Sequence, residues 1–164
     1  DVFPKAAIRV LADSSGAYPG TAGVTAAIGA LWGTSAAIPN WPETKGLTPS
    51  EWTLPGLFVH AARHDPSILL ARHDYAFDAV QTSFAQAAGV YDGNLLDQID
   101  GNERDIEAQG VQVRSWVAPG SEHTVVQRRA FYTERQGGML FRDWVADLLA
   151  GKGVTDNHCT SCQG

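Results

Sequence analysis

The stretch "VRSWVAPGSEHTVV", residues Val113–Val126, combines a predicted strand with the turn that ends it. Its first residues alternate between apolar and polar side chains, which is typical of a β-strand. The chain then breaks at Pro119-Gly120 and presents one histidine, His123, in the following loop. We therefore expect an ionisable ring just past the carboxyl end of a strand, where reactive groups of open α/β sheets gather.

Strand-like and helix-like segments alternate along the rest of the chain. The apolar runs "AAIRVLAD", which ends at Asp13, and "SILLAR", residues 67–72, predict buried parallel strands. Apolar spacing and closing glycines predict helices within residues 21–33, 77–89, 94–110 and 137–153. Residues 54–66 fit a strand or a helix, and the proline-rich residues 36–52 predict a surface excursion. The fold class is α/β, a mostly parallel sheet flanked by helices, over residues 1–154, followed by a cysteine-containing polar tail over residues 155–164.

Composition excludes several classes of protein. Hydrophobic residues make up 44% of the 164 residues, as in folded domains and unlike disordered chains. The net charge of -6 argues against a nucleic-acid partner, which requires a basic surface. No apolar run reaches the roughly 18 residues of a membrane span.

The two cysteines, Cys159 and Cys162, are spaced as Cys-x-x-Cys near the end of the sequence. This spacing is compatible with a redox pair, with half of a zinc site beside His158, or with disulfide bonding. Free thiols are a further alternative. A disulfide is the favoured interpretation, and it predicts a secreted protein, extracellular or periplasmic.

Ionisable side chains follow the predicted strands in a suggestive order. Asp74 and Asp78 come after "SILLAR", and His123 comes after the strand at residue 113. A carboxylate followed by a histidine is the order of the α/β-hydrolase triad, in which the carboxylate orients the histidine. The simpler alternatives are that Asp78 caps a helix and that His123 is a solvated loop residue. The cluster of His60, His64 and His73 lacks metal-ligand spacing, so no metal is predicted.

Several segments together resemble a known family. "PKAAIRVLADSSGAYPG", "FDAVQTSF", "APGSEHTVV", "FYT" and "MLFRDWVADLLAGKG" are similar, in this order, to the C-terminal half of pectin acetylesterases of bacterial type, a family that includes Notum. The most specific motifs are Asp-x-x-Gln at Asp78–Gln81 and Gly-Ser-Glu-His at Gly120–His123. The resemblance implies an α/β-hydrolase fold with Asp78 as the catalytic acid and His123 as the base. Asp74 is the reserve acid.

The family's nucleophile has no counterpart in this sequence. Members carry a serine in a Gly-x-Ser-x-Gly elbow, and that pattern does not occur in the 164 residues. "GTSAA", which contains Ser35, lacks the final glycine and follows a predicted helix instead of a strand. We therefore expect the nucleophile and the oxyanion hole on an N-terminal half, either a separate partner chain or an omitted segment. Ser14 is expected in the pocket wall, and Trp41 is a candidate for stacking on substrate.

The function expected from the resemblance is carboxylic ester hydrolysis by a Ser-His-Asp triad without a cofactor. The substrate class is an ester, with acylated polysaccharides as one example. The alternative is a binding or structural subunit that keeps the hydrolase-like fold without turnover, because fold alone does not fix function. A redox or metal module in the tail is a third, weaker alternative.

Overall fold

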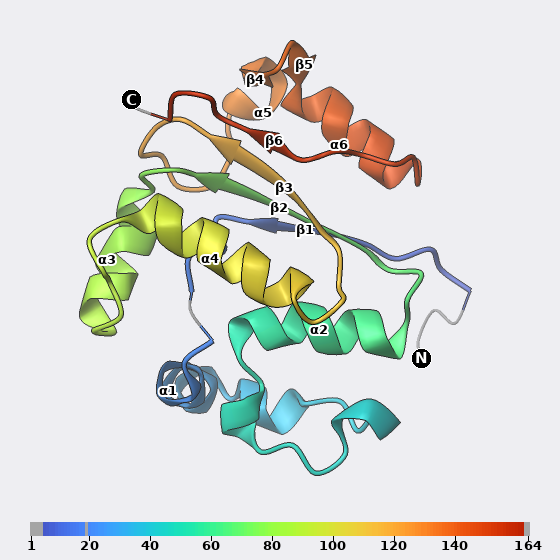
Figure 1. The fold of residues 1–164 in the computed structure, drawn as a ribbon. Coiled ribbons are helices and arrows are strands. Elements are labelled where there is room, and N and C mark those ends of the chain that lie inside the picture. The colour runs from blue at the N-terminus through green and yellow to red at the C-terminus, as the bar shows by residue number, and fades with distance from the viewer. Residues whose placement is uncertain (1–4, 19, 163–164) are drawn as a thin grey trace.

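A four-stranded parallel sheet forms the centre of the computed structural model, which describes residues 5–18 and 20–162, with Ser35 described by its backbone alone. The strand order is β1-β2-β3-β6. These strands are β1 (Arg9–Asp13), β2 (Leu69–Tyr75), β3 (Val113–Ala118) and β6 (Asn157–His158). Their carboxyl ends point to the same edge of the sheet, beside α3 in Figure 1.

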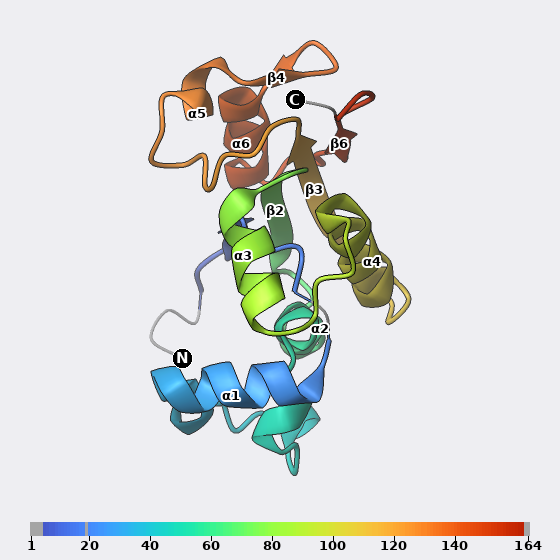
Figure 2. The same cartoon turned by 90° about the vertical axis from the view of Figure 1, so that its left-hand side faces the viewer.

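Helices cover both faces of the sheet, as Figure 2 shows with the sheet nearly edge-on between α6 and α4. The α-helices are α1 (Ala22–Trp32), α2 (Leu54–His64), α3 (Ala79–Ala87), α4 (Leu95–Glu107), α5 (Ala130–Thr133) and α6 (Phe141–Leu149). Short 3-10 turns η1 (Thr34–Ala37), η2 (Pro42–Thr44) and η3 (Pro49–Glu51) form the predicted excursion, and β4 (Arg135–Gln136) pairs with β5 (Met139–Leu140). The expected α/β class, a parallel sheet flanked by helices, is confirmed.

Alternation along β3 divides the core between the two faces. Trp116 packs with Phe141 and Trp144 of α6, at ring centroid distances of 5.2 and 5.8 Å. Its neighbour Val117 packs on the other face with Ile99 of α4. Successive strand side chains point to opposite faces, so this one strand fixes both helices on the sheet.

A buried arginine joins α4 to the sheet. The Arg72 side chain on β2 is only 1% exposed; it donates hydrogen bonds to Ser115 Oγ at 2.9 Å and to Ile99 O at 2.9 Å. Its Nη2 also lies 2.6 Å from Glu103 Oε2. A buried guanidinium requires such paired partners, and they are spread over β3 and α4. The strand "SILLAR" therefore carries one polar anchor among apolar residues.

In two segments the structure differs from the prediction, and in a third it decides between two alternatives. The strand predicted to end at Arg72 continues through Tyr75, so His73 and Asp74 lie inside β2 instead of after it. Residues 54–64 are a helix, capped by Thr53, whose Oγ1 accepts a hydrogen bond from Gly56 N. The tail predicted as a polar extension contributes β6, a two-residue strand beside β3.

The β1 edge of the sheet is open. Within residues 5–18 and 20–162, β1 pairs only with β2, and its residues are half-buried whereas those of β2 and β3 are mostly buried. A hollow of about 290 Å³ beside this edge is lined largely by apolar residues, among them Val10, Ala12 and Leu57. Unpaired strand edges present free backbone groups to another strand. Among the described residues, no helix is both long and apolar enough to span a membrane.

Candidate active site

Asp78 and His123 meet at the carboxyl edge of the sheet. Asp78 Oδ2 lies 2.9 Å from His123 Nδ1; the carboxylate is fully buried, and the histidine side chain is 34% exposed. Because a carboxylate only accepts, Nδ1 carries the proton in this pair, and in the neutral ring Nε2 keeps its lone pair. No hydrogen bond to Nε2 occurs among the described residues. The arrangement leaves a basic nitrogen available to a reacting group.

The position of Asp78 follows from its role as the N-cap of α3. Its Oδ1 accepts hydrogen bonds from the backbone amides of Val80 at 2.9 Å and Gln81 at 3.0 Å. Its Oδ2 is left for His123 and for Gln81 Nε2 at 3.2 Å. The two interpretations of Asp78, helix cap and partner of the histidine, therefore coexist on one carboxylate. The cap holds the carboxylate in the orientation that the imidazole needs.

Backbone hydrogen bonds hold the His123 loop against the turn that carries Asp78. Ala76 N donates to Ala118 O at 2.9 Å, and Phe77 N donates to Gly120 O at 2.9 Å. Ala79 N then donates to Ser121 O at 3.1 Å. These three backbone hydrogen bonds join the loop that follows β2 to the loop that follows β3. Gly120 has a φ of 116°, which a side chain would strain, and this explains the glycine before Ser-Glu-His.

The end of β1 holds the same loop from the other side. Asp13 accepts hydrogen bonds from the amides of Val125 and Val126 at about 3 Å, and Ser14 Oγ accepts one from Thr124 N at 2.7 Å. Ser14 is buried and has a φ of 60°. The structure thus places Ser14 next to the His123 loop with its hydroxyl engaged. Contact of Ser14 with substrate remains a prediction.

Asp74, the reserve acid, has other partners. Its Oδ1 accepts hydrogen bonds from Gly16 N at 2.8 Å and Gln81 Nε2 at 2.9 Å, and its Oδ2 lies 3.9 Å from Arg72 Nε. Burial raises the pKa of Asp74, although Arg72 and these hydrogen bonds lower it in part. Gln81 thus bridges the carboxylates of Asp74 and Asp78. The geometry favours Asp78 over Asp74 as the partner of His123.

His73 is a buried charge that the sequence did not reveal as such. It lies on β2 with Nε2 3.0 Å from Glu134 Oε1 and Nδ1 3.3 Å from Asp13 Oδ1. Burial alone lowers the pKa of His73, but its pairing with Asp13 and Glu134 outweighs burial and raises the pKa to about 9. Asp13 has a lowered pKa, because the contacts with His73 and two backbone amides outweigh its burial. Asp13 thus connects His73 of β2 to the backbone that follows His123.

The remaining candidates lie away from the Asp78–His123 pair. Trp41 stacks on His64 at the end of α2, with centroids 4.1 Å apart and planes 6° apart. That helix ends just before β2 begins, so Trp41 lies toward the amino end of the sheet, and one face of its indole is occupied. Ser35 lies in η1, directly after α1, and no strand leads into it. Neither Trp41 nor Ser35 therefore lies beside the Asp78–His123 pair. Stacking of Trp41 on substrate remains a prediction.

The pair can act as a general base whose tautomer is fixed by a buried carboxylate. His123 Nε2 can accept a proton from a hydroxyl and return it to a leaving group, while Asp78 stabilises the imidazolium formed in between.

One group of three potential metal ligands lies close together among the described residues. It consists of His158, Cys159 and Cys162 in the C-terminal segment. Comparison with protein-family models, with curated proteins and with solved structures gave no match.

Proposed function

We propose that this chain supplies the acid and the base of a serine esterase of the α/β-hydrolase type, similar to pectin acetylesterases. The observation that carries the proposal is the buried Asp78 carboxylate 2.9 Å from His123 Nδ1, with Nε2 left open. His123 accepts the proton of a serine hydroxyl as the serine oxygen attacks an ester carbonyl. The same nitrogen then protonates the departing alcohol, and water releases the acyl group in a second, equivalent step.

The serine and the oxyanion hole come from a further polypeptide segment that pairs with the open edge of β1. Two features support this location. Within the described part of the chain, the outer edge of β1 pairs with no strand, and an apolar hollow adjoins β1. The carboxyl end of β1 adjoins the His123 loop through Ser14 and Thr124. A strand added parallel to β1 would therefore end beside Ser14 and the His123 loop, which is where we expect the elbow.

The substrate is an ester, with acylated polysaccharides as one class, and no cofactor is required. The protein acts outside the cytoplasm, in the extracellular space or the periplasm. This location is supported by the disulfide between Cys159 and Cys162, because such bonds persist in oxidising compartments.

The proposal is tested on native, unreduced material that contains this chain together with any partner that copurifies. We expect intact mass spectrometry to reveal a second polypeptide with a Gly-x-Ser-x-Gly motif, and a fluorophosphonate probe to label its serine. His123→Ala should lower hydrolysis of an acetyl ester by several powers of ten, and Asp78→Asn by about 10⁴-fold. His64→Ala is the matched control, since His64 lies at the far end of α2.

Asp74→Asn distinguishes the two carboxylates. Its carboxylate bonds to Gly16 and Gln81, so the substitution should affect folding stability more than turnover. If Asp74→Asn abolishes turnover while Asp78→Asn does not, the acid is misassigned. Material that neither reacts with the probe nor hydrolyses esters identifies the chain as a non-catalytic binding or structural subunit.

A further inference from the structure

The C-terminal segment brings three soft and borderline metal ligands together. His158, Cys159 and Cys162 each offer one ligand atom, and these atoms lie within 4.8 Å of one another. In the structure the two sulfurs form a disulfide and offer no thiolate. We propose that, in the dithiol form, these three residues bind Zn²⁺, and that the disulfide is the metal-free form of the same site.

The orientation of His158 supports this proposal. Its Nε2 lies 3.0 Å from Asp100 Oδ1, so this nitrogen carries a proton that the carboxylate accepts. Its Nδ1 lies on the side of the sulfurs, 4.0 Å from Cys162 Sγ, and donates to Cys159 O at 3.3 Å, a hydrogen bond that metal binding would replace. Zinc-binding histidines commonly donate their second ring N–H to a carboxylate, which orients the ring and makes it a better ligand. Asp100 provides that carboxylate before any metal is present.

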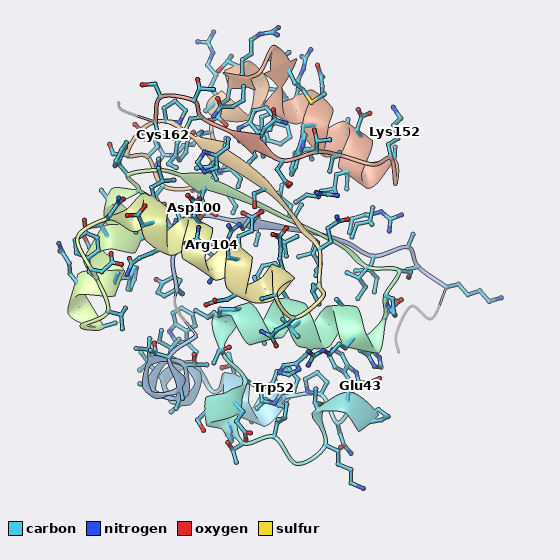
Figure 3. The ribbon with its side chains drawn as sticks, in the orientation of Figure 1. Glu43, Trp52, Asp100, Arg104, Lys152 and Cys162 are labelled. Carbon is cyan, nitrogen blue, oxygen red and sulfur yellow. A yellow bond between two sulfur atoms is a disulfide. The ribbon has the colours of Figure 1, made fainter. Side chains whose placement is uncertain are left out.

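The surrounding fold fixes two sides of the site. Cys159 is nearly buried, and its backbone N donates to Val117 O at 3.0 Å, which continues the pairing of β6 with β3. Asp100 belongs to α4, and Figure 3 shows Asp100 and Cys162 on the same face of the molecule. The ligands therefore come from the edge of the sheet, and their supporting carboxylate comes from a separate helix. A chance grouping on a free tail would lack this support.

Conversion between the two forms requires a dithiol reductant, so the zinc form belongs to reducing conditions and the disulfide is the form expected in the oxidising compartment proposed above. One thiolate of the reductant attacks a sulfur of the Cys159–Cys162 bond, and its second thiol completes the exchange; the protein gains two thiols, and the reductant becomes a disulfide. Zn²⁺ then displaces one proton from each thiol and takes the lone pair of His158 Nδ1. A water molecule completes the tetrahedral coordination that zinc prefers.

The test uses the whole chain, reduced with dithiothreitol, freed of reductant without oxygen, and titrated with Zn²⁺. We expect one bound zinc per reduced chain with release of two protons, no binding by the oxidised chain, and thiolate charge-transfer absorption when Co²⁺ replaces Zn²⁺. Cys162→Ser and His158→Ala should each remove high-affinity binding. Asp100→Asn should weaken it 10–100-fold, the effect typical of losing such a carboxylate.

His64→Ala is the control for loss of a histidine elsewhere and should bind zinc as the parent does. Circular dichroism of each variant separates loss of the site from loss of the fold. The proposal is overturned if the reduced chain binds no more zinc than the oxidised chain. It is equally overturned if folded His158→Ala and Asp100→Asn bind as tightly as the parent, since zinc would then be held by the thiols alone.

Discussion

The buried His73 makes the stability of this fold depend on pH in a defined window. Its pKa rises from 6.5 in the unfolded chain to about 9 in the fold, because Asp13 and Glu134 flank the buried ring. A group with a raised pKa stabilises the fold fully below the unfolded value, and the contribution disappears as pH rises through the folded value. The difference between these two pKa values corresponds to about 3 kcal/mol, since each tenfold change in proton affinity is worth about 1.36 kcal/mol. We therefore expect the free energy of unfolding to fall by about 3 kcal/mol between pH 6 and pH 9.5.

Urea denaturation at a series of pH values measures this loss. With a denaturant slope of about 2 kcal/mol/M, the urea midpoint should drop by about 1.5 M across the window. Burial lowers the pKa of His60, so its contribution to stability increases as pH rises toward 6.5 and has the opposite sign to that of His73. Burial raises the pKa of Tyr75, which therefore titrates above the window. His73→Gln should remove the slope, whereas His64→Gln should keep it. A parent protein equally stable at pH 6 and 9.5, or His73→Gln with the parent's slope, would refute the reasoning.

Three further predictions concern folding stability and are checked by the same urea measurement. Gly16→Ala should cost about 2 kcal/mol, because a Cβ there would collide with the Asp74 carboxylate. Gly23→Ala is the control and should be neutral or stabilising, because a Cβ there would meet no atom within 4 Å. Equal effects of the two substitutions would exclude the collision. Arg72→Met should cost about 3–5 kcal/mol because it strands the Glu103 carboxylate, and a neutral result would show that the pair is dispensable. Reducing the Cys159–Cys162 disulfide should cost only about 2 kcal/mol, since it closes a very short loop; global unfolding on reduction would contradict this.

The helices and the sheet class were predictable because their signals are local. The apolar spacing of the last helix and the N-cap at Asp78 can be seen within a few residues of sequence. The extent of β2 was not predictable in this way. His73 and Asp74 can lie in a buried strand because Asp13, Glu134 and Gly16 pair with their polar atoms. These partners are distant in the sequence, so a local pattern does not reveal them. A local reading of "ARHDY" therefore ends the strand too early.

The candidate site was predictable in part. The order of carboxylate and histidine came from the residues, and the choice of Asp78 over Asp74 came from the family resemblance; the geometry favours the same carboxylate. Two residues, Asn157 and His158, carry too little pattern to predict β6, although they bring His158 to Asp100. The grouping of His158 with the two cysteines could nevertheless be seen in the sequence, because His158 stands directly before the Cys-x-x-Cys motif.

The parallel pairing of the strands has a consequence for how the chain folds. Arg9 pairs with Leu69 and Leu70 pairs with Val113, so each ladder closes only after a long intervening segment has been ordered. Such distant pairings slow folding, because loop closure must precede the contacts that reward it. During synthesis β1 emerges long before its partner and stays available to other chains. We expect refolding to be slow and its yield to fall as protein concentration rises. Aggregation through β1 would compete with folding before β3 joins the sheet.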